Sequence, residues 1–288
     1  MTSSVIALAA GPMRCEIAPA LGGCIAGLWL DGVPVLRSTP ASELHSARFS
    51  GSYPLVPFSN RVGSASLQWD GTNHPLVKNH ATEPHSIHGI GWQRPWEVLE
   101  ADARSALLSF EHRGGGDWPF EFDTSQTFRL SEEGLALTIS VTNQSGRHAP
   151  FGLGWHPYFV KRADAVISFA ASGRWEMGAD NLPTRRVAST GIDGPCAALD
   201  VDHCFDGWTG ETRLADGVLD VTVRSSLRRQ VVFTNPQRDF VAIEPVSHVN
   251  NAVNLVAAGA GPAELGLAIL APGESFSAQM SIDVKGVK

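Results

Sequence analysis

One histidine of this sequence lies in the middle of an apolar, aromatic run, FGLGWHPYF at residues 151–159. Gly154 and Pro157 flank His156, which predicts a strand end or a bulge, where functional side chains are often presented. A histidine in such surroundings is more often a core residue hydrogen-bonded to a backbone carbonyl. The other interpretation is proton transfer, because imidazole titrates near neutral pH. The residue types alone leave both interpretations open.

The aromatic residues around this histidine suit a carbohydrate. Trp155, Tyr158 and Phe159 offer flat apolar faces, and Trp155 and Tyr158 add a polar tip. Such side chains match the faces of a sugar ring. We therefore expect a sugar-binding surface here, with Trp155 among its contacts.

A glutamate in a second apolar run is another candidate for proton transfer. Glu244 lies in VAIEPVSH, residues 241–248, after a predicted buried strand and before Pro245, which we expect to end that strand. Burial would raise the pKa of this carboxyl group and a nearby arginine would lower it, so its charge state can be tuned. The alternative is a strand-end glutamate in a salt bridge.

An arginine follows a segment that regular strand pairing does not suit. Two prolines in YPLVPF, residues 53–58, predict irregular backbone just before Ser59, Asn60 and Arg61. The rigid fork of donors on Arg61 is able to hold ligand hydroxyl groups. The alternative is an arginine that pins a loop to a carboxylate.

Three histidines occur within nine residues of the stretch 79–89, at His80, His85 and His88. A metal site is disfavoured, because the stretch is not helical, contains no cysteine, and zinc requires three or four ligands. We expect the histidine before Gly89 to face a ligand pocket. The alternative is a polar surface loop.

An aspartate in VDHCFDG, residues 201–207, is the last candidate. When ionised, Asp202 only accepts hydrogen bonds and is suited to sugar hydroxyl groups. The alternative is an aspartate that caps a turn.

The elements that position these residues are predicted to be strands. Three segments alternate with period two, as half-buried antiparallel strands do: 135–142, 219–224 and 276–284. Two others are more continuously apolar and predict deeply buried strands, 230–234 and 240–243.

Composition and length agree with an all-β fold. The 288 residues include 29 glycines and 18 prolines, which are scattered as turns between short strands would scatter them. No amphipathic helix of ten residues, linker or internal repeat interrupts the chain. We predict one domain over residues 1–288, with two large, mainly antiparallel sheets packed face to face.

Charge and hydropathy exclude several classes of partner. The formal net charge is −7, without a basic stripe, which argues against nucleic acid. The sequence contains no run of 18 apolar residues, so no membrane span is predicted. The N-terminus is a poor secretion signal. The four cysteines lack CxxC spacing, so we expect them to be reduced in the cytoplasm.

Taken in order, five motifs resemble those of the aldose 1-epimerase (galactose mutarotase) family. They are Asn60-Arg61, His88-Gly89, His156 to Phe159, Asp202-His203 and Glu244. The resemblance runs along most of the chain. It implies a galactose mutarotase-like β-supersandwich, a free monosaccharide as substrate, and no metal or organic cofactor.

The resemblance also implies roles for the residues. His156 matches the general acid of the family and Glu244 the general base. Arg61, His88 and Asp202 match residues that hold the sugar hydroxyl groups and ring oxygen, and Asn60 matches a supporting contact.

Other interpretations stay open at this point. The stretch 244–254 is closer to a bacterial branch with less defined substrates, in which His248 and Asn254 could contribute to sugar choice. The hexose-6-phosphate branch is disfavoured by the lack of a basic cluster, although Arg48 or Arg94 could reach a phosphate. A carbohydrate-binding protein without turnover and a hydrolase acting through two carboxylates are further alternatives. The chain is expected to be a monomer or a homodimer.

Overall fold

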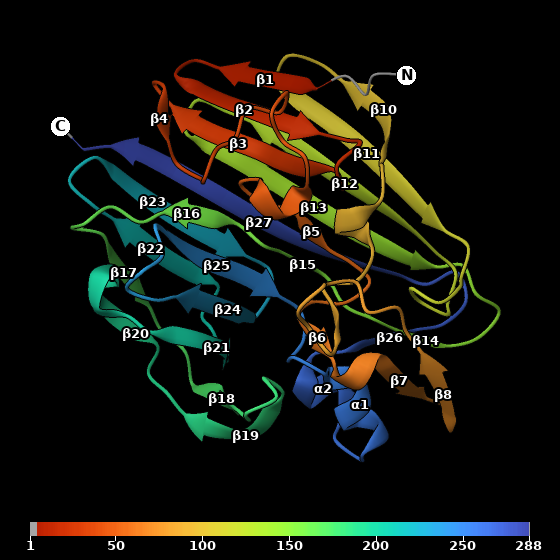
Figure 1. Ribbon diagram of the computed structural model, residues 1–288. Coiled ribbons are helices and arrows are strands. Elements are labelled where there is room, and N and C mark those ends of the chain that lie inside the picture. Colours follow the sequence, from red (N-terminus) through yellow and green to blue (C-terminus); the bar gives the residue numbers. More distant parts are fainter. Residues whose placement is uncertain (1–4, 288) are drawn as a thin grey trace.

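Two large antiparallel sheets dominate the computed structural model, which describes residues 5–287 (Figure 1). The larger sheet has nine strands, in the order β10 (Glu97–Ala101), β11 (Ser105–His112), β12 (Phe122–Leu130), β13 (Gly134–Asn143), β27 (Ser275–Gly286), β23 (Leu219–Ser225), β22 (Glu211–Ala215), β17 (Val166–Phe169) and β20 (Ile192–Pro195).

The second large sheet has eight strands and carries most of the candidate residues. Its order is β19 (Pro183–Ala188), β18 (Gly173–Met177), β21 (Val201–Asp206), β24 (Arg229–Thr234), β25 (Phe240–Val246), β15 (Gly154–Trp155) and β5 (Pro54–Leu55), with β16 (Tyr158–Val160) also paired to β25.

Smaller elements surround the two large sheets. A four-stranded sheet contains β1 (Ile6–Ala10), β2 (Met13–Ala18), β3 (Cys24–Leu30) and β4 (Val33–Pro34). Three strand pairs are β6 (Arg61–Val62) with β9 (Ser86–Ile87), β7 (Ser66–Trp69) with β8 (Thr72–Pro75), and β14 (Ala149–Phe151) with β26 (Ala268–Leu270). The helices are α1 (Ala252–Ala257), α2 (Pro262–Leu265) and the 3-10 turns η1 (Ala47–Phe49), η2 (Gly63–Ala65), η3 (Gly91–Gln93) and η4 (Cys196–Ala198). Over residues 5–287, no helix is long and apolar enough to span a membrane.

The predicted fold class and strands are confirmed. The three alternating segments form β13, β23 and β27, and the two apolar segments form β24 and β25. Burial alternates along β13 and β27, because one face of the nine-stranded sheet meets the other sheet and the opposite face meets solvent. β25 is buried along its whole length, so it has protein on both faces. The four cysteines are buried and unpaired.

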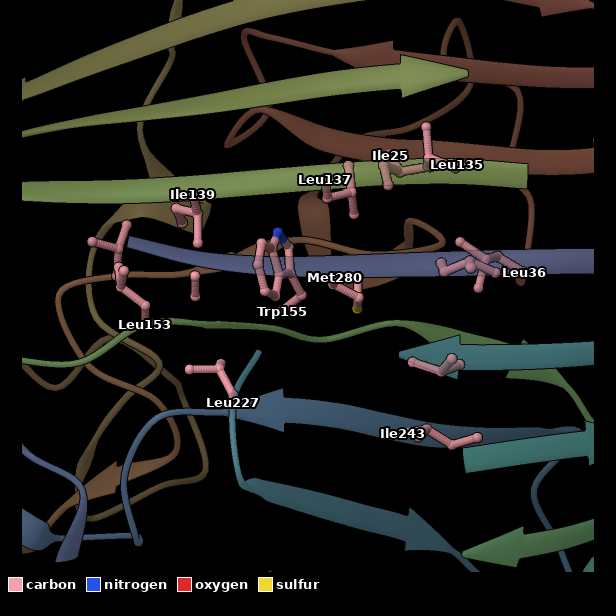
Figure 2. Packing of buried hydrophobic residues seen from close by; sticks show 14 of the residues in the cluster. Ile25, Leu36, Leu135, Leu137, Ile139, Leu153, Trp155, Leu227, Ile243 and Met280 are labelled. Carbon is pink, nitrogen blue, oxygen red and sulfur yellow. The ribbon is translucent and has the colours of Figure 1, made fainter. Parts of the chain in front are cut away.

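The main hydrophobic core fills the space between the two large sheets. Figure 2 shows Leu137 of β13 and Met280 of β27 lying close to Trp155 of β15, while Ile243 of β25 belongs to the same cluster. These side chains are almost fully buried. Successive residues of a strand point to opposite faces of the sheet. Glu244, which follows Ile243, and His156, which follows Trp155, must therefore point away from this core.

A second apolar cluster lies on the opposite face of the eight-stranded sheet. Tyr53, Tyr158, Val231 and Ala242 belong to it, and β3 contributes Cys24. This face therefore has a buried, apolar floor of its own. Glu244 and His156 rise from that floor.

The loop before η3 reaches this face through a close backbone contact. Gly89 has φ of +68°, and a Cβ on it would lie 2.3 Å from the carbonyl oxygen of Val56. That oxygen accepts hydrogen bonds from the backbone N–H groups of Ile90 and Gly91, both at 3.0 Å. Glycine is required here both for its positive φ and for its missing side chain.

We expect Gly89→Ala to lower the free energy of unfolding by about 3 kcal/mol or more, because the new methyl group meets backbone that cannot move aside. The matched control is Gly32→Ala. Gly32 has φ of +79° and nothing within 4 Å of the added Cβ, so only the conformational cost of about 1–2 kcal/mol applies. Urea titration monitored by tryptophan fluorescence measures both variants. Equal losses would contradict the proposed contact.

Candidate active site

The register of two neighbouring strands brings His156 against Glu244. Gly154 pairs with Val246, and Tyr158 pairs with Ala242. Continued through the break between β15 and β16, this register sets His156 directly opposite Glu244, with both side chains on one face. The His156 Nε2 atom lies 3.2 Å from Oε1 of Glu244.

Pro245 does not end the strand, contrary to our expectation. β25 continues to Val246, and Pro245 pairs with Gln230 of β24. The N–H of Ile243 donates to Pro157 O, so residues 243 and 245 both turn their backbone groups toward β15 and β16. The strand on that side is interrupted between β15 and β16. No strand hydrogen bond is therefore lost because Pro245 has no N–H.

Burial acts on the histidine and the glutamate in opposite directions. The exposed fraction is 7% for His156 and 2% for Glu244. Burial lowers the pKa of His156 to about 3, with a smaller contribution from the positive charge of Arg37. Burial also raises the pKa of Glu244 well above its usual range, and the charge of Asp202 raises it further. Both shifts favour a state in which the pair carries one proton and no net charge.

The pair also has unused hydrogen-bonding capacity. Nδ1 of His156 and Oε2 of Glu244 are buried and have no hydrogen-bond partner among residues 5–287. Buried polar atoms are normally paired, so two such atoms on adjacent residues require an explanation. Hydrogen bonds to a bound molecule would satisfy both atoms.

Aromatic rings hold the imidazole of His156 in place. The ring of Tyr158 stacks on it with centroids 4.3 Å apart, and the ring of Tyr53 lies at 4.8 Å. The two tyrosine hydroxyl groups are 3.3 Å from each other. His88 approaches His156 edge-on, at 5.1 Å between ring centroids.

His88 and Asn60 are interlocked. The backbone N–H of Asn60 donates to His88 Nδ1 at 3.1 Å, and the N–H of His88 donates to Asn60 O at 2.8 Å. Both residues have positive φ, 55° and 61°. Because Nδ1 accepts a hydrogen bond, the neutral ring must carry its proton on Nε2, which leaves Nε2 as a donor for a ligand. Burial lowers the pKa of His88 well below its usual value, and His156 adds to this effect.

Arg61 lies next to this pair and is held by a carboxylate. It donates to both carboxylate oxygens of Glu83, at 2.8 and 3.0 Å, and to Oδ1 of Asn60 at 3.2 Å. The alternative that Arg61 pins a loop to a carboxylate is therefore correct for its contact with Glu83. The charge of Arg61 nevertheless also reaches Glu244 and Asp202, whose pKa values it lowers against the larger effect of burial.

Asp202 stands on the same face of the sheet. It pairs with Phe233, and Phe233 pairs with Ala242, two residues before Glu244. It belongs to β21, so it does not cap a turn. Its side chain is exposed at the edge of the site, and desolvation by neighbouring protein still raises its pKa.

The expectation that Trp155 contacts a sugar is wrong. Its exposed fraction is 1%, and its ring belongs to the core between the two large sheets (Figure 2). The physical reason is strand alternation: because His156 faces Glu244, the preceding residue must face the opposite way.

The three clustered histidines have separate environments. His85 accepts the N–H of Ser64 at Nδ1, and its Nε2 contacts Asp180 O, so it braces two loops. His80 contacts Thr82 in its own loop. Only His88 of the three lies against His156. In the part of the chain that the structure describes, no three His, Cys, Asp or Glu residues are grouped to hold a metal ion.

His248 and Asn254 occupy structural positions rather than sugar-facing ones. His248 Nε2 accepts the N–H of Ser59, and its Nδ1 contacts Val249 O. Asn254 binds backbone groups of Gln68 and Ser66 through its amide. Both side chains are therefore engaged with protein.

Sequence reasoning missed three residues around the site: Tyr53, Glu83 and Arg37. Arg37 lies 3.8 Å above the ring of Tyr158, on the stack that contains His156. Tyr53 lies in the stretch 53–58 and Glu83 in the stretch 79–89, both of which contain or precede predicted site residues. Their contacts depend on pairings between distant segments, for which the sequence carries no local signal.

We predict that His88 remains neutral and protonated on Nε2 at about pH 6, where an ordinary histidine is largely charged. The cause is its burial together with the hydrogen bond accepted at Nδ1. Long-range proton–nitrogen NMR distinguishes the two tautomers and the charged ring. The exposed His45 serves as the internal control. A doubly protonated His88 would contradict the geometry.

The chain is similar to known proteins along nearly its whole length. A family model described as Aldose 1-epimerase matches residues 4–283. The uncharacterized protein YphB of Escherichia coli K12 is 30% identical over 301 residues, covering 98% of this chain and 99% of YphB. YihR of the same organism, also uncharacterized, is 24% identical and covers 88% of this chain and 87% of YihR.

Solved structures show the same fold. A candidate aldose 1-epimerase of Escherichia coli K12 superposes with a TM-score of 0.87 at 30% identity, covering 98% of this chain and 99% of that chain. A galactose mutarotase-like protein of Clostridium acetobutylicum has a TM-score of 0.83 at 22% identity, covering 97% and 94%. The family match over nearly the whole length, together with these two-sheet structures, shows that the chain belongs to the aldose 1-epimerase family.

Proposed function

We propose that the protein is a mutarotase that interconverts the α and β anomers of a free sugar. The observation that carries this proposal is the buried contact between His156 and Glu244, with Nδ1 and Oε2 unpartnered among the described residues. Ring opening of a hemiacetal needs one group to accept a proton and another to donate one. Two adjacent groups with opposite pKa shifts meet that need.

In the proposed reaction, Glu244 takes the proton from the anomeric hydroxyl group while protonated His156 gives one to the ring oxygen. The bond between the anomeric carbon and the ring oxygen breaks, and the aldehyde forms. Rotation about the bond to the next carbon exposes the other face. The two residues then exchange roles, and the ring closes as the other anomer. The pair holds one proton before and after each step.

Burial favours the pair that results from ring opening over the ion pair from which ring opening starts. Ring opening converts a charged imidazolium and carboxylate into a neutral imidazole and carboxylic acid. A desolvated site favours the neutral pair, and both pKa shifts have this direction. The two proton transfers of ring opening therefore create no new charge in the apolar surroundings.

Neighbouring residues support sugar binding. Arg61 and Nε2 of His88 supply donors, Asp202 supplies an acceptor, and Asn60 holds both donors through the contacts described above. A neutral sugar is the favoured substrate. Arg94 is engaged with Asp117 at 2.7 Å, and the charge of Arg61 is paired with Glu83. The four unpaired cysteines support a cytoplasmic location.

We expect Glu244→Gln to lower kcat for mutarotation by about 10²–10⁴-fold, since an amide cannot accept the proton. Sugar affinity should stay within about tenfold, because the amide keeps the size and most hydrogen bonds of the carboxylate. Polarimetry on fresh α-D-glucose and α-D-galactose measures kcat, and calorimetry measures binding.

The matched control is Glu132→Gln, which removes an exposed carboxylate in the turn between β12 and β13. It should leave the rate unchanged. Full activity in Glu244→Gln would refute the assignment of the base. Sugar binding by the wild type without acceleration of any aldose would instead indicate a carbohydrate-binding protein.

The pH dependence of kcat/KM should be a broad bell. Activity requires the pair to hold one proton, so the rate falls at low pH when a second proton binds and at high pH when the last one leaves. The lowered pKa of His156 sets the acid limb below the usual histidine value of about 6.5, and the raised pKa of Glu244 extends the basic limb upward. Polarimetric rates corrected for the uncatalysed reaction test this. An acid limb at or above the usual histidine value would contradict it.

A further inference from the structure

The loop that carries the three histidines also carries a carboxylate that binds Arg61 from the side. Oε2 of Glu83 accepts from Nε at 3.0 Å, and Oε1 accepts from Nη2 at 2.8 Å. The exposed fractions of the two side chains are only 11% for Arg61 and 17% for Glu83. This is a sheltered bidentate pair, which is stronger and more directional than an ordinary surface ion pair.

The carboxylate itself is held by a braced loop. The side-chain amide of Asn79 donates to the carbonyl oxygens of Ile87 and Gly89, at 2.7 and 2.9 Å, and accepts the N–H of Ile87 at 2.8 Å. His85 ties the same loop to Ser64. Both ends of the loop are therefore fixed, which limits where the Glu83 carboxylate can lie.

The orientation of Arg61 decides which of its donors are available. A guanidinium group has five N–H donors in a rigid plane. Glu83 occupies one on Nε and one on Nη2, and Asn60 Oδ1 occupies one on Nη1 at 3.2 Å. One N–H on Nη1 and one on Nη2 are left. They have a fixed direction, as recognition of a sugar oxygen requires.

The carboxylate of Glu83 is paired with the same cation that acts on Glu244. The charged and titratable groups that act on or face Glu244 are His156, Asp202, Arg61, Tyr53, Tyr158 and Cys204. Arg61 is the cation that lowers the pKa of Glu244, against the effect of burial. An unbalanced Arg61 would hold Glu244 ionised more strongly and weaken it as a base.

We propose that Glu83 is a positioning residue for the mutarotation reaction, which orients two free donors of Arg61 toward the sugar and offsets the arginine charge beside Glu244. This inference rests on the proposed function. It assigns to one carboxylate two separable tasks, one geometric and one electrostatic. Two substitutions separate them.

The experiment compares Glu83→Gln with Glu83→Asp by full kcat and KM determinations across the pH range. Glu83→Gln keeps the length and removes the charge, so its basic limb should move to lower pH by about half a unit or more. Glu83→Asp keeps the charge and shortens the reach. Its basic limb should stay in place while KM rises about tenfold, because the donors are no longer aligned.

The matched control is Asp220→Asn. Asp220 binds Arg213 in the same bidentate way, at 2.8 and 2.8 Å, on the nine-stranded sheet. It should change neither the pH profile nor KM. A merely structural role for Glu83 would lower the amount of folded protein without moving the basic limb, and that result overturns the inference.

Two outcomes distinguish this inference from the function on which it rests. Turnover by the wild type with unchanged pH profile and KM in both Glu83 variants overturns only the role of Glu83. Absence of turnover by the wild type with every aldose overturns both. If Glu83→Gln does not fold, the tenfold KM change in Glu83→Asp decides the case, and its absence overturns the inference.

Discussion

The site depends on one register between strands that are far apart in sequence. β25 and the interrupted strand β15–β16 align so that His156 and Glu244 face each other at 3.2 Å. A shift of one residue would turn one of the two side chains into the core and bring an apolar residue out. The continuous apolar face of the sheet therefore protects the register, because such a slip would place a titratable polar side chain in the core between the sheets. The same alternation enforces folding stability and the geometry of the contact between His156 and Glu244.

The eight-stranded sheet serves two purposes through its two faces. One face packs against the nine-stranded sheet through residues such as Trp155 and Ile243. The other face has an apolar floor that includes Tyr158 and Ala242, from which His156 and Glu244 rise. This floor removes water from the pair without supplying hydrogen-bond partners, which is why both pKa shifts arise from burial first. A similar pair on a solvated face would titrate near its ordinary values.

Local patterns predicted the strands well, because alternation and apolar runs are properties of neighbouring residues. The five site motifs were also visible, since their residue types and order are retained in the sequence. The sequence could not supply pairing between distant segments. An example is Arg61 of β6, which binds Glu83 in the loop before β9, 22 residues further along the chain. The assignment of Trp155 failed for a local reason: alternation itself excludes adjacent residues from sharing one face. Pro245 was misjudged because its neighbouring strand is broken, which is a tertiary property.

The contact between His156 and Glu244 and the donors around it have different kinds of structural support. His156 and Glu244 are fixed by sheet register, which tolerates little change. Asn60 and His88 are left-handed loop residues that hold each other by reciprocal hydrogen bonds, and such strained conformations persist only where the surroundings determine them. Arg61 is aligned from outside by a braced loop. In the proposed reaction, changes in these loops would alter which hydroxyl groups are bound and leave His156 and Glu244 in place. Under the proposed function, this separation would allow one reaction to serve different sugars on a single scaffold.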